Sequence, residues 1–199
     1  MIPRHLIIGV VVMVLVALAM SLYVLHMRGS ARRAETTAAA VQPVAPPVSG
    51  STEQVTLYVA YDADGSLHAL PTQIPLPAGR QERAQEVLRA LLNIYLGNSS
   101  PHPLGAGSEV RDVYLVDPGL AVIDLNGAFA QGHRSGVLVE ELTVFSLLET
   151  LSANIPGIAR IKILVEGKET ESLAGHVDLT NIYDTTTIAQ AVRELQAVQ

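Results

Sequence analysis

Leu6 and Leu25 bound a run of twenty residues, LIIGVVVMVLVALAMSLYVL, that contains no charged side chain. At a rise of about 1.5 Å per residue, a helix of this length spans about 30 Å, the thickness of a bilayer's hydrocarbon core. Arg4 and Arg28 flank the run on its two sides, as in segments held at both membrane interfaces. Because a helix that is apolar all round offers water no polar face, we predict a transmembrane anchor over residues 1–28 that binds the lipid bilayer.

A cleaved signal peptide is the competing interpretation of this run. The apolar part of a signal peptide has about 7–15 residues and ends at a small-residue cleavage site. Here the run is longer, and the arginine-rich stretch HMRGSARRAE follows it, so we favour an uncleaved anchor. Arg28, Arg32 and Arg33 would by themselves keep the following domain in the cytoplasm, but long domains cross the membrane regardless of such a bias.

Residues 29–53 are dominated by alanine, proline, serine and threonine. Such a composition buries too little apolar area to offset the entropy of ordering, which predicts a flexible linker. The absence of cysteine excludes disulfides and a lipidated N-terminal cysteine. The net charge of −6 argues against nonspecific binding to nucleic acid, which requires a basic surface.

Residues 54–184 alternate pairs of short apolar strands with amphipathic helices, in the order β-β-α-β-β-α-β-β. This order predicts an α+β fold: a two-layer sandwich in which an antiparallel or mixed sheet carries both helices on one face. Residues 185–199 form an amphipathic tail helix, which we expect to pack on its own domain rather than on a partner. The predicted strands are 55–61, 66–76, 110–116, 120–125, 158–165 and one that starts at 170, and the predicted helices are 80–96 and 137–153.

These pieces resemble the GerMN domain, the sporulation and spore germination domain. The resemblance covers roughly residues 55–183, and it depends on the opening VTLYVAYDADGSLHAL, the helix AQEVLRALL, the hairpin VYLVDPGLAVIDLNGAF with the helix LTVFSLLETL, and the ending IARIKILVEGKETESLAGHVDL. One departure is GAGSEV at residues 105–110, where family members usually show a Gly-Thr pair before the strand. The order and spacing of the other pieces agree with the family.

The resemblance implies a small α+β domain related in shape to ring-building modules of envelope secretion machinery. Such domains lie outside the cytoplasm behind a lipid or transmembrane anchor, and the family is linked to spore germination, envelope assembly and peptidoglycan. We therefore expect a single-pass protein of the cytoplasmic (inner) membrane with its main domain on the extracytoplasmic, periplasmic side. The family brings no agreed catalytic residues.

The stretch DADG, residues 62–65, contains two carboxylates of the kind that bind calcium. An EF-hand loop counted from Asp62 places Gly65 too early and puts Gln73 at the twelfth position, where a bidentate glutamate is required. Asp-Gly is a strong hairpin signal, so we predict a tight turn.

The stretch GHRSG, residues 132–136, differs in spacing from the G-x-S-x-G nucleophile elbow. We expect Ser135 to lie at or near the N-cap of the second helix and to accept a backbone N–H there. Glu140 and Glu141 are about 100° apart on that helix, so they do not face one another as a catalytic carboxylate pair. We expect one or both in a solvated first turn, where the helix dipole favours negative charge.

Four histidines lie in four separate segments, with no H-x-x-x-H pair and no cysteine nearby. Zinc sites normally include at least one close pair of ligands, so isolated surface or turn positions are predicted, with a cluster formed by the tertiary fold as the alternative. These histidines are His68, His102, His133 and His176.

The stretch VEGKETESLAGHVDL, residues 165–179, admits two interpretations. It contains His176 with Asp178 and Glu171, as a base with a supporting carboxylate would require. It also has the pattern of a final hairpin, with a charged turn at 166–169 and a returning strand after it. We favour the hairpin.

We therefore predict no catalytic, cofactor-binding or metal-binding residue, and a non-catalytic role in binding or assembly with an envelope protein or peptidoglycan. The alternative is a peptidoglycan-remodelling hydrolase, or its accessory factor, that uses carboxylates or a histidine in a cleft. A third interpretation is self-association of the domain into rings.

Overall fold

The first hairpin forms because alternate residues of its first strand are apolar. In the computed structural model, which describes residues 51–116 and 118–197, strand β1 (Thr52–Tyr61) buries Val55, Leu57 and Val59. It pairs antiparallel with β2 (Ser66–Pro75), from Thr52 opposite Pro75 to Tyr61 opposite Ser66. Residues 62–65 form the predicted turn, in which Gly65 has the positive φ of 67° that favours glycine.

The second sheet has four strands in the order β3-β4-β5-β6. Strands β4 and β5 are parallel and the other neighbours are antiparallel, so the sheet is mixed. The predicted returning strand from residue 170 is wrong: only isolated bridges form in that segment, and the strand that returns beside β5 is β6. The strands are β3 (Val110–Val116), β4 (Leu120–Leu125), β5 (Arg160–Val165) and β6 (Ile182–Asp184).

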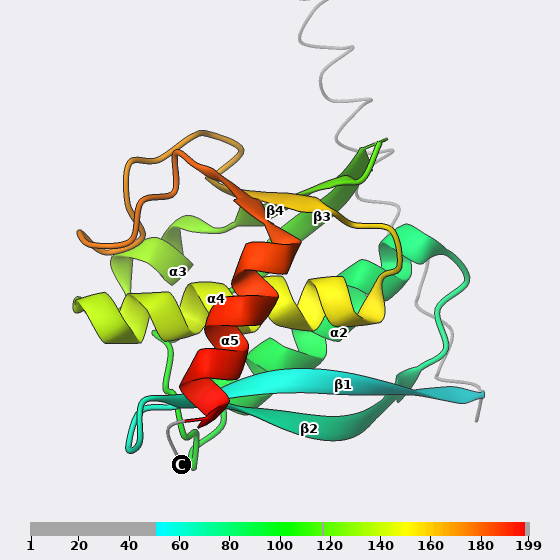
Figure 1. Ribbon diagram of the computed structural model, residues 1–199, viewed down its shortest axis with the longest axis horizontal. Coiled ribbons are helices and arrows are strands. Elements are labelled where there is room, and N and C mark those ends of the chain that lie inside the picture. The colour runs from blue at the N-terminus through cyan, green and yellow to red at the C-terminus, as the bar shows by residue number, and fades with distance from the viewer. Residues whose placement is uncertain (1–50, 117, 198–199) are drawn as a thin grey trace, which may run out of the picture. The chain divides into compact units, whose positions relative to one another are not determined.

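Two long helices, α2 (Arg80–Tyr95) and α4 (Val137–Asn154), lie between the hairpin and the four-stranded sheet (Figure 1). The α+β class is confirmed, but the single sheet with both helices on one outer face is wrong. The physical reason lies in α4, whose buried residues run around most of its circumference and therefore require cover on more than one side. These include Leu142, Val144, Leu147, Leu148 and Leu151.

Two further helices complete the described fold. Helix α3 (Gly127–Gln131) lies between the predicted strand 120–125 and the predicted helix 137–153. Its N-cap is Asn126, whose side chain accepts the N–H of Phe129 at 2.9 Å. Helix α5 (Thr185–Ala197) crosses in front of α4 in Figure 1 and buries Ile188 and Val192, so the prediction that it packs on its own domain is confirmed. Between residues 51 and 197, no described helix is long and apolar enough to cross a bilayer. The predicted anchor and most of the predicted linker lie outside the described residues.

The backbone N–H and C=O groups on the free edge of β1 form hydrogen bonds with polar side chains of α4 rather than with a third strand. Asn154 accepts the N–H of Thr56 at 3.0 Å and donates to its carbonyl at 2.7 Å. One and two turns earlier on the helix, Thr150 accepts the N–H of Tyr58 at 2.9 Å and Ser146 donates to the Tyr58 carbonyl at 2.6 Å. The spacing of four residues places these side chains in one row, which closes an edge that would otherwise pair with another chain.

We expect Asn154→Ala to lower the free energy of unfolding by about 2 kcal/mol, because both backbone groups of Thr56 lose their partner. Urea unfolding of the purified protein measures this change. Ser152→Ala is the matched control on the same helix, since among the described residues the Ser152 hydroxyl bonds only to the carbonyl of Glu149. We expect a change below about 0.5 kcal/mol. Equal urea midpoints for Asn154→Ala and Ser152→Ala would contradict the role of Asn154 at the edge of β1.

Candidate functional site

Glu140, in the first turn of α4, is the most heavily hydrogen-bonded carboxylate of the described fold. It is fully buried, so the expectation of a solvated residue is wrong for Glu140. Its Oε2 accepts the backbone N–H groups of Ala174, His176 and Val177 at 3.0–3.1 Å. Its Oε1 accepts the N–H of Gly136 at 3.1 Å and the ring Nδ1–H of His176 at 2.8 Å.

These five bonds set the protonation of Glu140. Burial by itself raises the pKa of a carboxyl group, but the backbone N–H of Val177 and the ring of His176, followed by the other N–H donors, outweigh it and lower the pKa of Glu140 to about 2. The group is therefore a fixed anion at neutral pH. It ties residues 174–177 to the start of α4, which is why these residues do not continue a β-ladder.

Two other buried charges hold the same segment, residues 166–181, which we call the anchored loop. Lys162 on β5 donates its Nζ–H to the carbonyls of Leu179 at 3.1 Å and Thr180 at 2.6 Å. Asp124 on β4 accepts the N–H of Gly167 at 2.7 Å. Both side chains are less than one-tenth exposed, so α4, β4 and β5 each contribute one buried charge to the conformation of the anchored loop.

Ser135, His176 and Glu140 come together, yet they do not form a catalytic triad. The Ser135 hydroxyl lies 3.4 Å from His176 Nδ1, the same nitrogen that lies 2.8 Å from Glu140 Oε1. In a triad the serine and the carboxylate contact opposite ring nitrogens, so that one accepts the serine proton while the other is oriented. The Nδ1–H that donates to Glu140 cannot accept a proton from Ser135. The helix N-cap is Gly136 rather than Ser135, so the predicted capping bond of Ser135 is replaced by that of Glu140.

A second polar cluster joins two histidines from different loops. His102 Nδ1 lies 2.6 Å from Asp62 Oδ1, and its Nε2 lies 2.5 Å from the Thr143 hydroxyl. His133 Nε2 reaches the same hydroxyl at 2.7 Å. Both rings are buried, with centroids 6.3 Å apart, so the prediction of isolated surface or turn histidines is wrong for these two.

Burial is the main influence on both rings. It lowers the pKa of His102 against the opposing effect of Asp62, and it lowers the pKa of His133 against the hydrogen bond to the Arg134 carbonyl. In the neutral form, each of the two histidine rings donates its Nδ1–H away from Thr143 and directs its Nε2 toward the Thr143 hydroxyl. The single hydroxyl proton of Thr143 serves one acceptor at a time, either one of these two ring nitrogens or the Val139 carbonyl at 3.0 Å. The cluster therefore ties the loops before β3 and α4 to the helix.

His68 and His176 have other hydrogen-bond partners. His68, on β2, has its Nε2 2.8 Å from the Ser66 hydroxyl and 3.5 Å from Asp64. Across residues 51–116 and 118–197, no three His, Cys, Asp or Glu side chains are placed to hold a metal ion. Asp62 accepts hydrogen bonds from His102 and Arg134.

A pocket of about 250 Å³ opens between α4 and the anchored loop. Its apolar wall includes the half-buried ring of Phe145 and the 55% exposed Val137. Glu141, the neighbour of Glu140, points to this side of α4 rather than into the fold. The lining residues are Val137, Glu141, Phe145, His176, Val177, Asp178, Asn181 and Tyr183.

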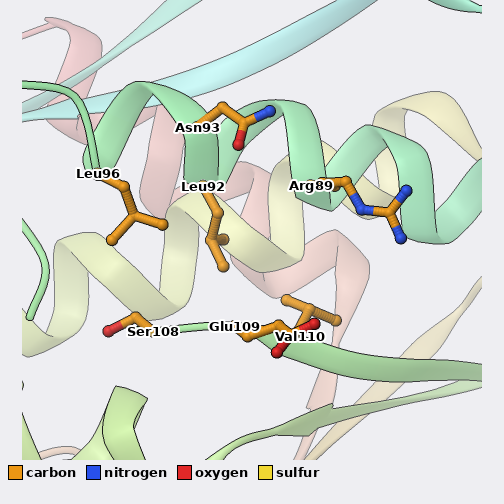
Figure 2. A pocket seen from close by; sticks show the side chains of 7 residues that line it. All are labelled: Arg89, Leu92, Asn93, Leu96, Ser108, Glu109 and Val110. Carbon is orange, nitrogen blue, oxygen red and sulfur yellow. The ribbon is translucent and has the colours of Figure 1, made fainter. Parts of the chain in front are cut away.

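A second pocket, of about 190 Å³, lies between α2 and the start of β3. Figure 2 shows Leu92 and Leu96 of α2 pointing toward the segment that carries Ser108 and Val110. Its polar groups are largely engaged, because the Arg89 guanidinium pairs with Glu86 and the Ser108 hydroxyl donates to the Gly105 carbonyl. The pocket beside the anchored loop is the stronger candidate.

Sequence reasoning missed the residues that build this candidate site. Phe145, Asn181 and Tyr183 carry no motif, and they meet only because the anchored loop folds back over α4. One signal was present for the edge of β1: the row of Ser146, Thr150 and Asn154 on an otherwise apolar helix. Polar residues at a spacing of four on a buried helix require partners.

A family model described as Germane, sporulation and spore germination, matches residues 56–171, more than half of the 199 residues. A crystal structure from Clostridium perfringens, of a protein described as a lipoprotein, is 20% identical with a TM-score of 0.44 and covers 74% of this chain and 96% of that chain. The first GerMN domain of the Bacillus subtilis sporulation protein GerM is 21% identical with a TM-score of 0.47 and covers 64% of this chain and 93% of that chain. The tandem GerMN domains of the same protein are 20% identical with a TM-score of 0.46, and the match covers 65% of this chain and 44% of that chain. No curated protein matches this chain.

Proposed function

Because this chain belongs to the Germane family of sporulation and spore germination domains, we propose that it is a non-catalytic binding or assembly module of the bacterial cell envelope. In this proposal residues 6–25 hold it in the cytoplasmic membrane, and the domain lies on the extracytoplasmic side. There it binds an envelope protein that takes part in a sporulation, germination or peptidoglycan-associated complex.

One observation carries the proposal: the pocket beside the anchored loop has a fixed conformation and an exposed apolar rim. Three buried charges hold the loop, and Val137 at the start of α4, which lines the pocket, is 55% exposed. Exposed apolar side chains beside a rigid concave surface are typical of protein interaction sites. The histidines and Glu140, which are the strongest acid–base candidates, make hydrogen bonds that hold the fold.

We expect a photoreactive benzoylphenylalanine at position 137 of the full-length protein to crosslink one discrete partner in its native membrane. The same amino acid at Gln81, an exposed position of α2, is the control and should give no such adduct. An adduct of twice the chain's mass would identify self-association as the assembly. The proposal fails if position 137 gives no adduct or the same set of adducts as position 81.

Glu141 and Asp178 both line the pocket, and a pair of carboxylates in a cleft is what glycoside hydrolysis requires. A peptidoglycan-remodelling hydrolase is therefore the alternative. Dye-labelled peptidoglycan incubated with the full-length protein in detergent distinguishes the two: we expect no release of soluble label above buffer. Release that is lost in Glu141→Gln would establish the hydrolase.

A further inference from the structure

We propose that the pocket beside the anchored loop binds the side chain of a lysine or arginine carried by the protein partner. This inference rests on the proposed binding function and names the chemical feature that the partner presents. It follows from the balance of donors and acceptors in the pocket, from the apolar wall, and from the absence of lysine and arginine among the described residues that line it.

The polar atoms left available in the pocket are mainly acceptors. Among the described residues Glu141 makes no hydrogen bond and no ion pair, so its carboxylate is open to a ligand. The donors are engaged: the Tyr183 hydroxyl donates to the Asp178 carbonyl at 2.5 Å, and the Asn181 amide donates to the Asp178 carboxylate at 2.8 Å. His176 donates its Nδ1–H to Glu140, so this donor is engaged as well.

Asp178 supplies the second negative charge. Hydrogen bonds from the side chain and then the backbone of Thr180 lower the pKa of Asp178, so the carboxylate stays ionised. The charge of Lys162 also lowers the pKa of Asp178, but that ammonium already donates to two carbonyls and lies 3.1 Å from Glu169 Oε1. Two carboxylates in a pocket whose lining residues include no lysine or arginine favour a cationic ligand.

The apolar wall suits the rest of a long cationic side chain. Val137 and Val177 line the pocket beside the ring of Phe145. Lysine and arginine lay their methylene groups on such surfaces while the charged head stays with acceptors, and an aromatic ring nearby adds a favourable contact for the cation. A neutral side chain would leave the negative charges of Glu141 and Asp178 uncompensated, and an acidic side chain would be repelled by them.

The test uses the full-length protein in detergent micelles, with ¹³C-labelled valine methyl groups as reporters. Three tripeptide amides, acetyl-Ala-Lys-Ala, acetyl-Ala-Arg-Ala and acetyl-Ala-Gln-Ala, are titrated while the methyl shifts of Val137 and Val177 are followed. We expect the lysine and arginine peptides to bind with dissociation constants on the order of 1 mM and the glutamine peptide at least about fivefold more weakly.

Glu141→Gln should weaken lysine-peptide binding about fivefold. The matched control is Glu171→Gln, an exposed carboxylate of the anchored loop that does not line the pocket, and it should bind as the unchanged protein does. Equal binding of the glutamine peptide, equal behaviour of the two variants, or no shifts at all would each overturn this inference. If the peptides fail while the crosslink at position 137 still forms, the binding function stands and only the cationic ligand is wrong.

Discussion

Glu140→Gln is expected to lower the free energy of unfolding by about 3 kcal/mol. The carboxylate accepts five hydrogen bonds while fully buried, and a glutamine amide would turn an NH₂ group toward N–H donors. Loss of one partner of such a buried charged network leaves the remaining groups without compensation. Urea unfolding followed by circular dichroism at pH 7 measures the change.

The pH dependence of this difference has a defined sign. The pKa of Glu140 is about 2 in the folded protein, below the value of a free glutamate, so the unfolded chain takes up the proton first as the pH falls. The stabilisation from the carboxylate is therefore complete above about pH 5 and is lost as the pH falls toward 2. The gap in stability between the unchanged protein and Glu140→Gln should shrink over that interval.

Glu141→Gln is the control, because the neighbouring carboxylate is half-buried and makes no hydrogen bond among the described residues. The free energy of unfolding of Glu141→Gln should match that of the unchanged protein within about 0.5 kcal/mol. If Glu140→Gln were as stable as this control, the anchoring of residues 174–177 by Glu140 would be wrong.

His102→Ala is expected to lower the free energy of unfolding by about 3 kcal/mol. The ring is fully buried, donates to the ionised Asp62, contacts the Thr143 hydroxyl, and packs edge-on against Tyr95 with centroids 5.0 Å apart. Its removal leaves a cavity and takes a hydrogen bond from a charged group, and each effect is worth about 1–3 kcal/mol. Urea unfolding at pH 7 measures the loss.

His68→Ala is the comparison, because it makes the same histidine-to-alanine change at a half-buried position on β2. We expect it to cost less than about 1 kcal/mol. Equal losses for the two substitutions would show that the buried cluster of His102, His133 and Thr143 contributes little beyond an ordinary surface histidine.

These structural roles bear directly on the candidate site. The anchored loop holds Val177, Asp178 and Asn181 against α4, and Glu140 fixes that loop from beneath. A variant that loosens the loop would therefore disturb ligand binding without touching the ligand. This is why the binding test uses Glu141 and Glu171, whose carboxylates hold no other part of the described fold.

Much of the α+β fold follows from local sequence. The alternation in Val55, Leu57 and Val59, with Asp-Gly after them, predicts the first hairpin, because a strand exposes alternate residues to opposite faces. The apolar period of residues 80–96 likewise predicts α2. What local pattern missed was the second side of α4: a helix that is apolar over most of its circumference needs two covering layers, but the pattern does not say which strands supply them.

Residues 165–179, at the candidate site, show the same limit of prediction from local sequence. Its composition indicates a turn after β5, and Val165 does pair with Lys168 as a tight turn requires. Whether the chain then returned as a strand depended on Glu140, Lys162 and Asp124, which lie on three other elements. By itself, the sequence determined most of the helices and strands and their approximate ends, with α3 and β6 as the exceptions, because propensity and period act between near neighbours. Only the tertiary structure decided the pairing of His102 with His133, the burial of Glu140 and the acceptor-lined pocket, because those depend on charges brought together from distant parts of the chain.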